Sequence, residues 1–402
     1  MIFSAHKLAR IVLATAFVAA ALSQSAMAAP VPSLTLDQSA TRAAAVKLIN
    51  SGAGFLLKAQ QPDGAFAPAQ APVGMNALVL KALVQAPGYG YANTSVKKGF
   101  DKLLSFQVDS GGIYKDSLAN YNTAIAISAL ASADSPDLVP AIRKATTYLK
   151  SLQWTDAIVG PKGEKIDANH PWFGGWGYGG LSRGPGSPDL SNTQMAIEAL
   201  HDAGLKEDDP AYKNALKFVT RLQNSSETND QPWAGDDGGF VYSPAADGKG
   251  ESMAGEFAGA EGQRLLRSYG AMSYAGLKSM IYAGLSKDDP RVKAAWNWIR
   301  SNWTLDENPG MRAGNPANAQ SGMFYYYHTM ARALRSYGEA DVIDTKGVHH
   351  DWRAELVTKF AALQNPDGSW SGERRWMEDN PVLTTSYVLL ALEEVIAPAE
   401  GK

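Results

Sequence analysis

The sequence predicts an all-α fold built from six repeated pairs of helices. Three observations support this prediction: a recurring Gln followed by a Gly-aromatic turn, an Ala/Leu-rich segment after each turn, and almost no strand patterns. Repeats that alternate two helical segments are typical of stacked helical hairpins. With 45% hydrophobic and 19% charged residues, the 402-residue chain also has enough apolar side chains for a large core.

The Gln positions mark the repeat. The clearest copies are residues 55–66 and 360–370, where Gln, Pro, Asp and Gly precede an aromatic residue. The markers are Gln60, Gln107, Gln153, Gln223, Trp303 in a degenerate copy, and Gln364. Their spacings are 47, 46, 70, 80 and 61 residues, so a base period near 46 carries insertions in the third, fourth and fifth units.

The segment before each marker has the spacing of an amphipathic helix. In the first unit, apolar residues recur at helical intervals at Val46, Ile49, Ala53 and Leu56. Asp-Pro pairs at 209–210 and 289–290 stand where two further helices are expected to begin. Pro fits the first turn of a helix, and Asp caps its free N–H groups. The first segment of each unit is therefore predicted to be a helix.

The segment after each Gly-aromatic turn is apolar around most of its circumference, which is typical of a helix buried on several sides. These segments are residues 76–83, 123–130, 193–200, 274–281, 329–334 and 385–392. Two architectures fit six such pairs: an open superhelix, and a closed ring with six inner and six outer helices. The repeat period alone does not distinguish them.

The Gln-x-Pro-Asp-Gly-x-aromatic motif of residues 60–66 and 364–370 resembles the QW-type repeat of the prenyltransferase and squalene-oxidase (terpenoid cyclase) superfamily. The resemblance extends over about residues 42–395 and implies an (α/α)6 toroid, a closed ring around a central cavity. It also implies that the motif joins the end of one outer helix to its neighbour, because a Gln amide can satisfy free backbone groups at a helix end. This structural role is expected for Gln60, Gln107, Gln153, Gln223, Gln364, Trp370 and Tyr178.

The catalytic motifs of this superfamily are not intact in the sequence. There is no Cys, which excludes disulfides, a thiolate zinc site and the thioester of complement-type toroids. There is no Asp-x-Asp-Asp, the acid motif of terpenoid cyclases, and Ser191 stands where the resemblance to prenyltransferases requires a zinc-binding Cys. The sequence therefore predicts no metal and no cofactor, and it leaves open whether the protein is an enzyme.

Polar and aromatic residues gather where the inner helices are expected to begin, which is where the cavity of the ring would open. The candidate cavity-lining residues are Trp176, Asp189, Asn192, Arg267, Tyr269, Tyr326, His328 and Trp376. Simpler structural roles are also open for some of them. Asp189 and Asn192 fit helix N-caps, and Arg267 fits a surface ion pair. His328 fits a buried core residue as well as a proton shuttle.

Residues 1–28 are predicted to form a cleavable signal peptide. Lys7 and Arg10 precede the apolar run 11–22, and Ala26 and Ala28 are the small residues that a signal peptidase recognises. The run is too short to span a bilayer as a helix. We therefore expect an exported protein, periplasmic or secreted, with an N-terminal extension over residues 29–41 and the toroid over residues 42–398.

For function, the resemblance implies a central cavity that binds or transforms an apolar, isoprenoid-like small molecule. One alternative is a non-catalytic toroid that binds an exported protein through the insertions at 155–171, 224–234 and 245–267. A second alternative is a polysaccharide-processing (α/α)6 barrel with paired carboxylates, for which the sequence offers Asp189, Asp236, Asp237, Glu256 and Glu378 without a spacing that pairs any two of them. The net charge of −3, without runs of Lys or Arg, argues against a nucleic-acid partner, and no segment after residue 28 resembles a membrane span.

Overall fold

The computed structural model describes residues 36–180, 185–245 and 248–398. The predicted signal peptide, residues 1–28, lies outside the described residues. The first helix begins at Leu36, so residues 36–41 of the predicted N-terminal extension belong to that helix. Among the described residues, every helix falls short of the length or the apolar content that a membrane span requires.

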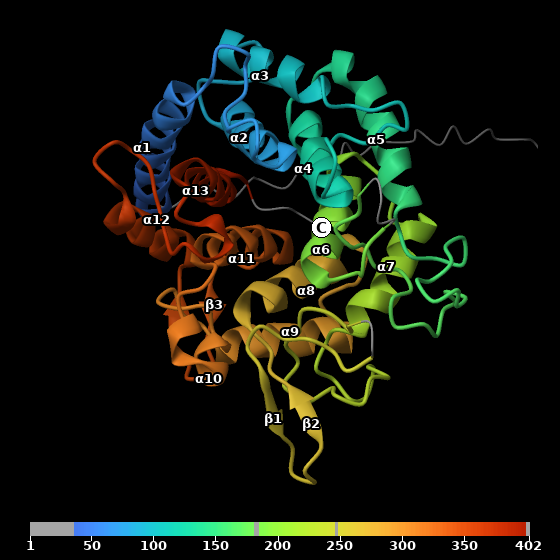
Figure 1. Cartoon of the computed structure of the whole chain (residues 1–402). Coiled ribbons are helices and arrows are strands. Elements are labelled where there is room, and N and C mark those ends of the chain that lie inside the picture. The colour runs from blue at the N-terminus through green and yellow to red at the C-terminus, as the bar shows by residue number, and fades with distance from the viewer. Residues whose placement is uncertain (1–35, 181–184, 246–247, 399–402) are drawn as a thin grey trace, which may run out of the picture.

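Twelve long helices in the described part of the chain form two concentric rings (Figure 1). The outer ring consists of α1 (Leu36–Lys58), α3 (Thr94–Leu104), α5 (Val139–Ser151), α7 (Pro210–Thr220), α9 (Pro290–Ser301) and α12 (Trp352–Leu363). The inner ring consists of α2 (Val73–Gln85), α4 (Ala119–Ser132), α6 (Leu190–Asp202), α8 (Gly270–Tyr282), α11 (Met323–Tyr337) and α13 (Pro381–Ile396). All six predicted inner segments lie within these inner helices.

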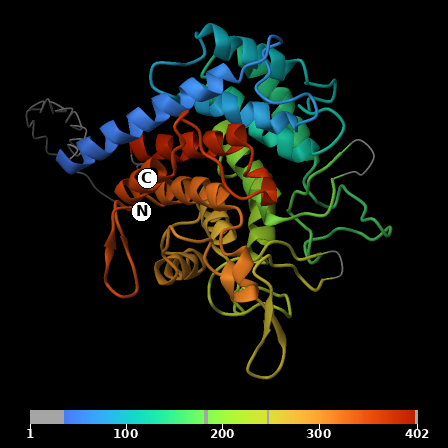
Figure 2. The ribbon, with the colours of Figure 1, turned by 60° about the vertical axis from the view of Figure 1, so that its left-hand side comes forward.

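The inner ring is closed. Each inner helix packs on the next in the order α2, α4, α6, α8, α11 and α13, and α13 packs back on α2. The long first helix α1 covers this last junction from outside, because it contacts both α13 and α2 (Figure 2). The closed ring is therefore confirmed, and the open superhelix is excluded by the contact between the last inner helix and the first.

Short elements occupy the connections. They are 3-10 helices at Pro136–Leu138, Pro316–Asn318 and Arg375–Met377, the one-turn helix α10 (Met311–Gly314), and strands β1 (Glu256–Ala258), β2 (Arg264–Leu266), β3 (Val342–Ile343) and β4 (His349–His350). β1 pairs antiparallel with β2, and β3 with β4. The β1–β2 hairpin projects away from the helices in both views (Figures 1 and 2). The strands lie in loops between the helices and do not alter the all-α architecture.

The outer helices begin at the residues that the sequence indicated. The Asp209 carboxylate accepts a hydrogen bond from the Ala211 N–H at 2.9 Å, and Asp289 accepts one from the Arg291 N–H at 2.9 Å. The Pro that follows each Asp opens the helix without the loss of a needed N–H. These Asp residues are helix caps, as the Asp-Pro pattern predicts.

The repeated Gln joins consecutive outer helices. In the third unit, the Gln153 amide donates to the Gly174 carbonyl of its own turn and to the Ala211 carbonyl in the first turn of α7, each at 2.9 Å. Gln60, Gln107 and Gln223 make the same pair of bonds, to Gly64 and Ser95, Gly111 and Ala141, and Gly238 and Arg291. Gln364 donates to the Gly368 carbonyl. One amide thus satisfies two backbone acceptors and fixes the distance between neighbouring units.

The aromatic residue of the motif is fixed from both sides of the unit. The Trp176 indole N–H donates to the Leu149 carbonyl of α5 at 2.8 Å, and the Trp176 backbone N–H donates to the Thr193 hydroxyl of α6 at 3.0 Å. The preceding Gly174 has a φ of +91°, and a Cβ there would lie 1.9 Å from the Asn214 carbonyl oxygen. Only Gly therefore permits this approach to α7.

A cluster of buried charges fills the ring at the C-terminal halves of the inner helices. Glu198 of α6 lies between Lys81 of α2, 2.8 Å from its Nζ, and Lys278 of α8. Asp202, one turn further along α6, lies 3.1 Å from Lys81 and 2.9 Å from Arg332 of α11. Because helix C-termini carry a negative potential, three cations at this end are favourably placed.

The cluster extends to the last inner helix. Glu394 of α13 lies 2.9 Å from Arg332 and 2.7 Å from Arg335. The charges therefore connect α2, α6, α8, α11 and α13 across the centre of the toroid. This end of the ring is filled with paired polar groups, which leaves the opposite end for a cavity.

Candidate functional site

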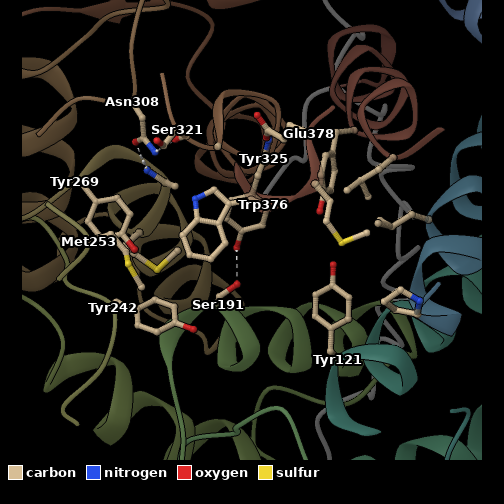
Figure 3. Close-up of a pocket in the computed structure, with 18 of the residues that line it drawn as sticks. Tyr121, Ser191, Tyr242, Met253, Tyr269, Asn308, Ser321, Tyr325, Trp376 and Glu378 are labelled. Atoms are coloured by element: carbon tan, nitrogen blue, oxygen red, sulfur yellow. Dashed lines mark hydrogen bonds between the residues drawn. The ribbon is translucent and has the colours of Figure 1, made fainter. Parts of the chain in front are cut away.

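A cavity of about 320 Å³ lies at the N-terminal ends of the inner helices (Figure 3). All six inner helices contribute to its wall, because their first turns meet at the same end of the ring. Representative residues are Met75 of α2, Tyr121 of α4, Ser191 of α6, Met272 of α8, Tyr325 of α11 and Tyr387 of α13. The position agrees with the prediction that the cavity opens where the inner helices begin.

The wall of the cavity is aromatic and thioether-rich. It contains Tyr121, Tyr178, Tyr242, Tyr269, Tyr325, Tyr387 and Trp376, together with Met75, Met253, Met272, Met311 and Met377. Burial raises the pKa of the Tyr121 hydroxyl to about 12, so this side chain is neutral at physiological pH. Among the described residues of the wall there is no Lys, Arg or His. Such a surface suits an apolar ligand.

The mouth of the cavity exposes large apolar side chains. Trp376, Met377 and Tyr178 are 49%, 45% and 41% exposed. Trp376 and Met377 both have a φ of 63°, a left-handed conformation that is costly for side chains of this size. Figure 3 shows the Trp376 indole projecting among the other lining side chains. The strained segment thus places an indole at the entrance.

Glu378 is the one charged residue among the described residues of the wall. Its Oε1 accepts hydrogen bonds from the Phe324 and Tyr325 N–H groups, each at 2.9 Å, at the start of α11. The residue is 1% exposed, and Oε2 has no hydrogen-bond partner among the described residues. Burial raises the pKa of this carboxyl to about 7, although the backbone N–H groups act in the opposite direction.

Asp189 lies behind the wall at the start of α6. Its carboxylate accepts from the Asn192 N–H and from the Asn192 side-chain amide, both at 2.8 Å. The residue is 3% exposed, and burial raises its pKa to about 7 against hydrogen bonds from Asn192 and from the Tyr242 hydroxyl. Asp189 is therefore an N-cap, and Tyr242 connects it to the cavity.

A short hydrogen-bonded group links α6 to α11 across the wall. The Tyr325 hydroxyl lies 3.1 Å from the Ser191 hydroxyl (Figure 3). The Gln194 amide donates to the same Tyr325 oxygen at 3.1 Å. Ser191 is the residue that stands where the prenyltransferase pattern has Cys. Within the described ranges, no three His, Asp or Glu side chains lie together in a metal-binding arrangement.

Of the predicted cavity residues, Tyr269 and Trp376 belong to the wall. Asp189 and Asn192 lie one layer behind it as the cap of α6. Trp176 lies elsewhere, because its indole is fixed against α5 as part of the repeat motif. Figure 3 shows Tyr269 beside Met253 on the side of the cavity formed by the fourth unit.

The three remaining candidates lie outside the wall. The Tyr326 side chain points toward the outer ring, where its hydroxyl donates to the Thr304 carbonyl at 2.9 Å. The Arg267 guanidinium lies over the Phe257 ring of the β1–β2 hairpin, 4.8 Å from its centroid. His328 lies deeper, at a separate cavity of about 20 Å³ beside the buried charges, and burial lowers its pKa to about 3. His328 is therefore a neutral core residue.

The structure adds lining residues that the sequence analysis missed. Tyr178 was expected to serve as the structural aromatic residue of the repeat motif, but it lies at the mouth of the cavity. Trp176 has the structural role instead, because its indole is fixed against α5. The Tyr325 N–H donates to Glu378 and the Tyr325 ring lines the cavity, whereas the neighbouring Tyr326 faces the outer ring. Glu378 was considered only as one of several carboxylates. Its position after the last repeat motif and before α13 is the one sequence signal that could have indicated it.

Replacing Asp189 by Asn is expected to remove a pH-dependent contribution to stability. The raised folded-state pKa means that this contribution is fully present below the unfolded-state pKa, near 4, and is lost as the pH rises through about 7. The free energy of unfolding of the wild type relative to Asp189→Asn should therefore fall by about 1.4 kcal/mol per pH unit between those limits.

Urea denaturation at a series of pH values measures this difference. Asn is also a good N-cap, so the variant keeps the hydrogen bonds that begin α6. If the difference in free energy of unfolding between the wild type and Asp189→Asn stays constant from about pH 5 to about pH 7, the pKa of Asp189 is not raised.

The fold is shared with solved proteins of low sequence identity. The type II terpene cyclase MstE from Scytonema, in complex with geranylgeranyl dihydroxybenzoate, matches with a TM-score of 0.53 and 14% identity over 89% of this chain and 99% of that chain. An α-1,6-mannanase from Salegentibacter matches with a TM-score of 0.52 and 11% identity over 89% and 98%. A D-mannose isomerase matches with a TM-score of 0.53 and 12% identity over 86% and 96%.

No protein-family model matches the chain, and no curated protein matches it. The structural comparisons confirm the α/α toroid, a fold that this chain shares with a terpene cyclase and a mannanase. At these identities the likeness concerns the fold. The activities named for the three neighbours differ, so the fold alone does not select among them.

Proposed function

We propose that this protein binds an apolar, isoprenoid-like small molecule in the cavity at the N-terminal end of its inner ring. The observation that carries the proposal is the wall itself, where six Tyr, five Met and one Trp surround about 320 Å³. Rings and thioethers contribute favourable contacts to hydrocarbon chains and adapt to their shape. The exposed Trp376 and Met377 provide an apolar entrance.

The wall supports an apolar ligand better than a polysaccharide. Hydrolysis of a glycosidic bond by the usual route needs two carboxyl groups that face each other across the substrate. Among the described residues, Glu378 is the carboxyl group of the wall, and Asp189 is engaged by Asn192 behind it. The adjacent pair Asp236 and Asp237 lies outside the wall, where these residues accept hydrogen bonds from Ser226 and Ser268.

Binding of farnesyl methyl ether, followed by Trp fluorescence and by calorimetry, tests the proposal. We expect saturable binding to the wild type and no binding of mannotriose. Ala271, which lines the cavity, is suited to a blocking variant, because Ala271→Trp would fill the space with an indole. This variant should weaken binding by about tenfold or more, since the ligand and the new ring compete for one volume.

A matched control is Ala361→Trp, which adds the same ring at an exposed position of α12. It should bind the ether as the wild type does. Equal binding by both variants would place the ligand outside the cavity and contradict the proposal. Binding of mannotriose that Ala271→Trp abolishes would favour the carbohydrate alternative instead.

A further inference from the structure

Two hydroxyl groups from different inner helices meet in the wall of the cavity. Ser191 lies in the first turn of α6 and Tyr325 in the first turn of α11, and both residues line the cavity. Their hydroxyl oxygens are 3.1 Å apart. Figure 3 shows the two oxygens directed at each other among the other lining side chains. A ligand in the cavity would therefore meet this pair.

Both residues of the pair are open to the cavity. Ser191 and Tyr325 are each partly exposed, although the residues on either side of them in the chain are buried. These buried neighbours are Leu190, Asn192, Phe324 and Tyr326. Glu378, the charged residue of the wall, differs from the pair because it is 1% exposed and its carboxyl group is directed at the N–H groups of α11. The pair is thus the more accessible polar group.

The hydrogen-bond donors of the pair can be counted. Each hydroxyl group has one hydrogen and two lone pairs. The Gln194 amide donates to the Tyr325 oxygen at 3.1 Å, so this bond uses a lone pair and neither hydroxyl hydrogen. The bond between Ser191 and Tyr325 uses one hydroxyl hydrogen, whichever oxygen donates it. One hydroxyl hydrogen therefore remains without an acceptor among the described residues.

The remaining hydrogen is present at physiological pH. The Ser191 hydroxyl does not ionise in this range, and burial raises the pKa of the Tyr325 hydroxyl, so both groups keep their protons. A hydrocarbon that displaces water from the pair would leave this hydrogen unpaired, which is costly in an apolar cavity. An oxygen acceptor on the ligand would remove that cost.

We propose that the Ser191–Tyr325 pair donates its remaining hydrogen to a neutral oxygen acceptor on the ligand, such as the carbonyl oxygen of an apolar ketone. This inference rests on the proposed function and names the polar group of the ligand that the same cavity binds. The hydrocarbon part of the ligand lies against the Tyr and Met side chains of the wall.

The charge of the wall favours a neutral acceptor over an anionic one. Among the described lining residues there is no Lys, Arg or His, and Glu378 contributes a carboxyl group. A carboxylate or diphosphate on the ligand would therefore lose its water without gaining a cation. A ketone oxygen carries no net charge and needs only the one donor that the pair offers.

Farnesylacetone, and the hydrocarbon in which a C=CH2 group replaces its C=O group, test the proposal. The two molecules have nearly the same shape, but only the ketone accepts a strong hydrogen bond. The double variant Ser191→Ala/Tyr325→Phe removes both hydroxyl hydrogens and adds no bulk. We expect it to bind the ketone about tenfold more weakly than the wild type does, and to bind the hydrocarbon within about threefold of the wild type.

The two single variants test whether the hydroxyl groups act as a pair. Removing either hydroxyl group also removes the bond between them, so the other one keeps a hydrogen for the ligand. Ser191→Ala and Tyr325→Phe should therefore each weaken ketone binding by less than about twofold, and the double variant should lose more than their combined effect. A single variant that loses as much as the double variant would contradict the sharing of one hydrogen.

Tyr326→Phe is the matched control for the loss of a Tyr hydroxyl group. The Tyr326 hydroxyl donates to the Thr304 carbonyl outside the cavity, so this variant should bind both ligands as the wild type does.

Infrared spectroscopy of the bound ketone observes the hydrogen bond directly. In the wild type, the C=O stretch should lie below its frequency in hexane, because a hydrogen bond weakens the C=O bond. In the double variant it should return toward the value in hexane. The wild-type measurement stands by itself if the double variant fails to fold and binds neither ligand.

Two results would overturn this inference while the proposed function stands. In the first, the double variant binds both ligands but its ratio of ketone to hydrocarbon affinity equals that of the wild type. In the second, the C=O stretch of the ketone bound to the wild type has the same frequency as in hexane. If neither ligand binds the wild type, both this inference and the proposed function are wrong.

Discussion

Replacing Glu198 by Ala is expected to lower the free energy of unfolding by about 3–5 kcal/mol, because it leaves buried cations without their counter-charge. Glu198 is paired with Lys81 at 2.8 Å and with Lys278. The Lys278 side chain is 1% exposed. Taking one member from a buried ion pair is far more costly than the pair itself is stabilising.

The two lysines should respond differently. Burial lowers the pKa of Lys278, and Glu198 only partly opposes this effect. Burial also opposes the charged form of Lys81, but Asp202 and Glu198 together outweigh it and raise the pKa. Among the described residues, Lys278 pairs only with Glu198, whereas Lys81 also pairs with Asp202 and keeps that partner in the variant. We therefore expect Lys278 to lose its proton in the variant, which limits the destabilisation.

Urea denaturation at neutral pH measures the effect, with Asp101→Asn as the control. Asp101 pairs with Lys97 at 3.4 Å on the surface, where both side chains are more than half exposed. Such pairs contribute about 0–1 kcal/mol. A Glu198→Ala variant as stable as Asp101→Asn would show that the buried cluster is not needed to hold the inner helices together.

Replacing Trp370 by Ala is expected to destabilise the toroid by about 3–5 kcal/mol, because the ring loses a large buried side chain where it closes. Trp370 is fully buried. Its indole N–H donates to the Phe360 carbonyl of α12 at 2.8 Å, and its backbone N–H donates to the Thr385 hydroxyl of α13 at 3.1 Å. A Cβ at Gly52 of α1 would lie 3.0 Å from the indole, so the ring also packs on the first helix.

Trp376→Ala supplies the matched comparison, since it removes the same ring from a position that is 49% exposed. It should change the thermal and urea stability by less than about 1 kcal/mol. It should weaken ligand binding, because the indole lines the cavity mouth. Equal destabilisation by the two variants would mean that the repeat motif has no special role in closing the ring.

Much of the fold could be predicted from the sequence, because the same residue types mark the helix starts and the contacts between units in each repeat. The Gln markers predicted contacts between neighbouring units, and Gln153 makes them to Gly174 and Ala211. The Asp-Pro pairs predicted helix starts at Pro210 and Pro290. These contacts and helix starts are local, because each forms between one turn and the helix that follows it.

The candidate site was predicted less well, because the direction of a side chain depends on packing. Trp176 and Tyr178 are two residues apart in one loop, yet Trp176 is fixed against α5 while Tyr178 reaches the cavity mouth. Tyr325 and Tyr326 are consecutive, and because successive helical residues point in different directions, only Tyr325 lines the cavity. Composition alone cannot separate such neighbours.

The class of fold, the number of helical pairs and the contacts between neighbouring pairs follow from the repeats in the sequence. Repetition makes these features redundant, since each is encoded several times by the same residue types. The resemblance of the repeat also implied a closed ring, but the contact between α13 and α2 that closes it, the charges that fill one end and the position of Glu378 in the wall at the other end became visible only in the folded chain. Each of these depends on residues from units far apart in the chain, which meet only when the ring is complete.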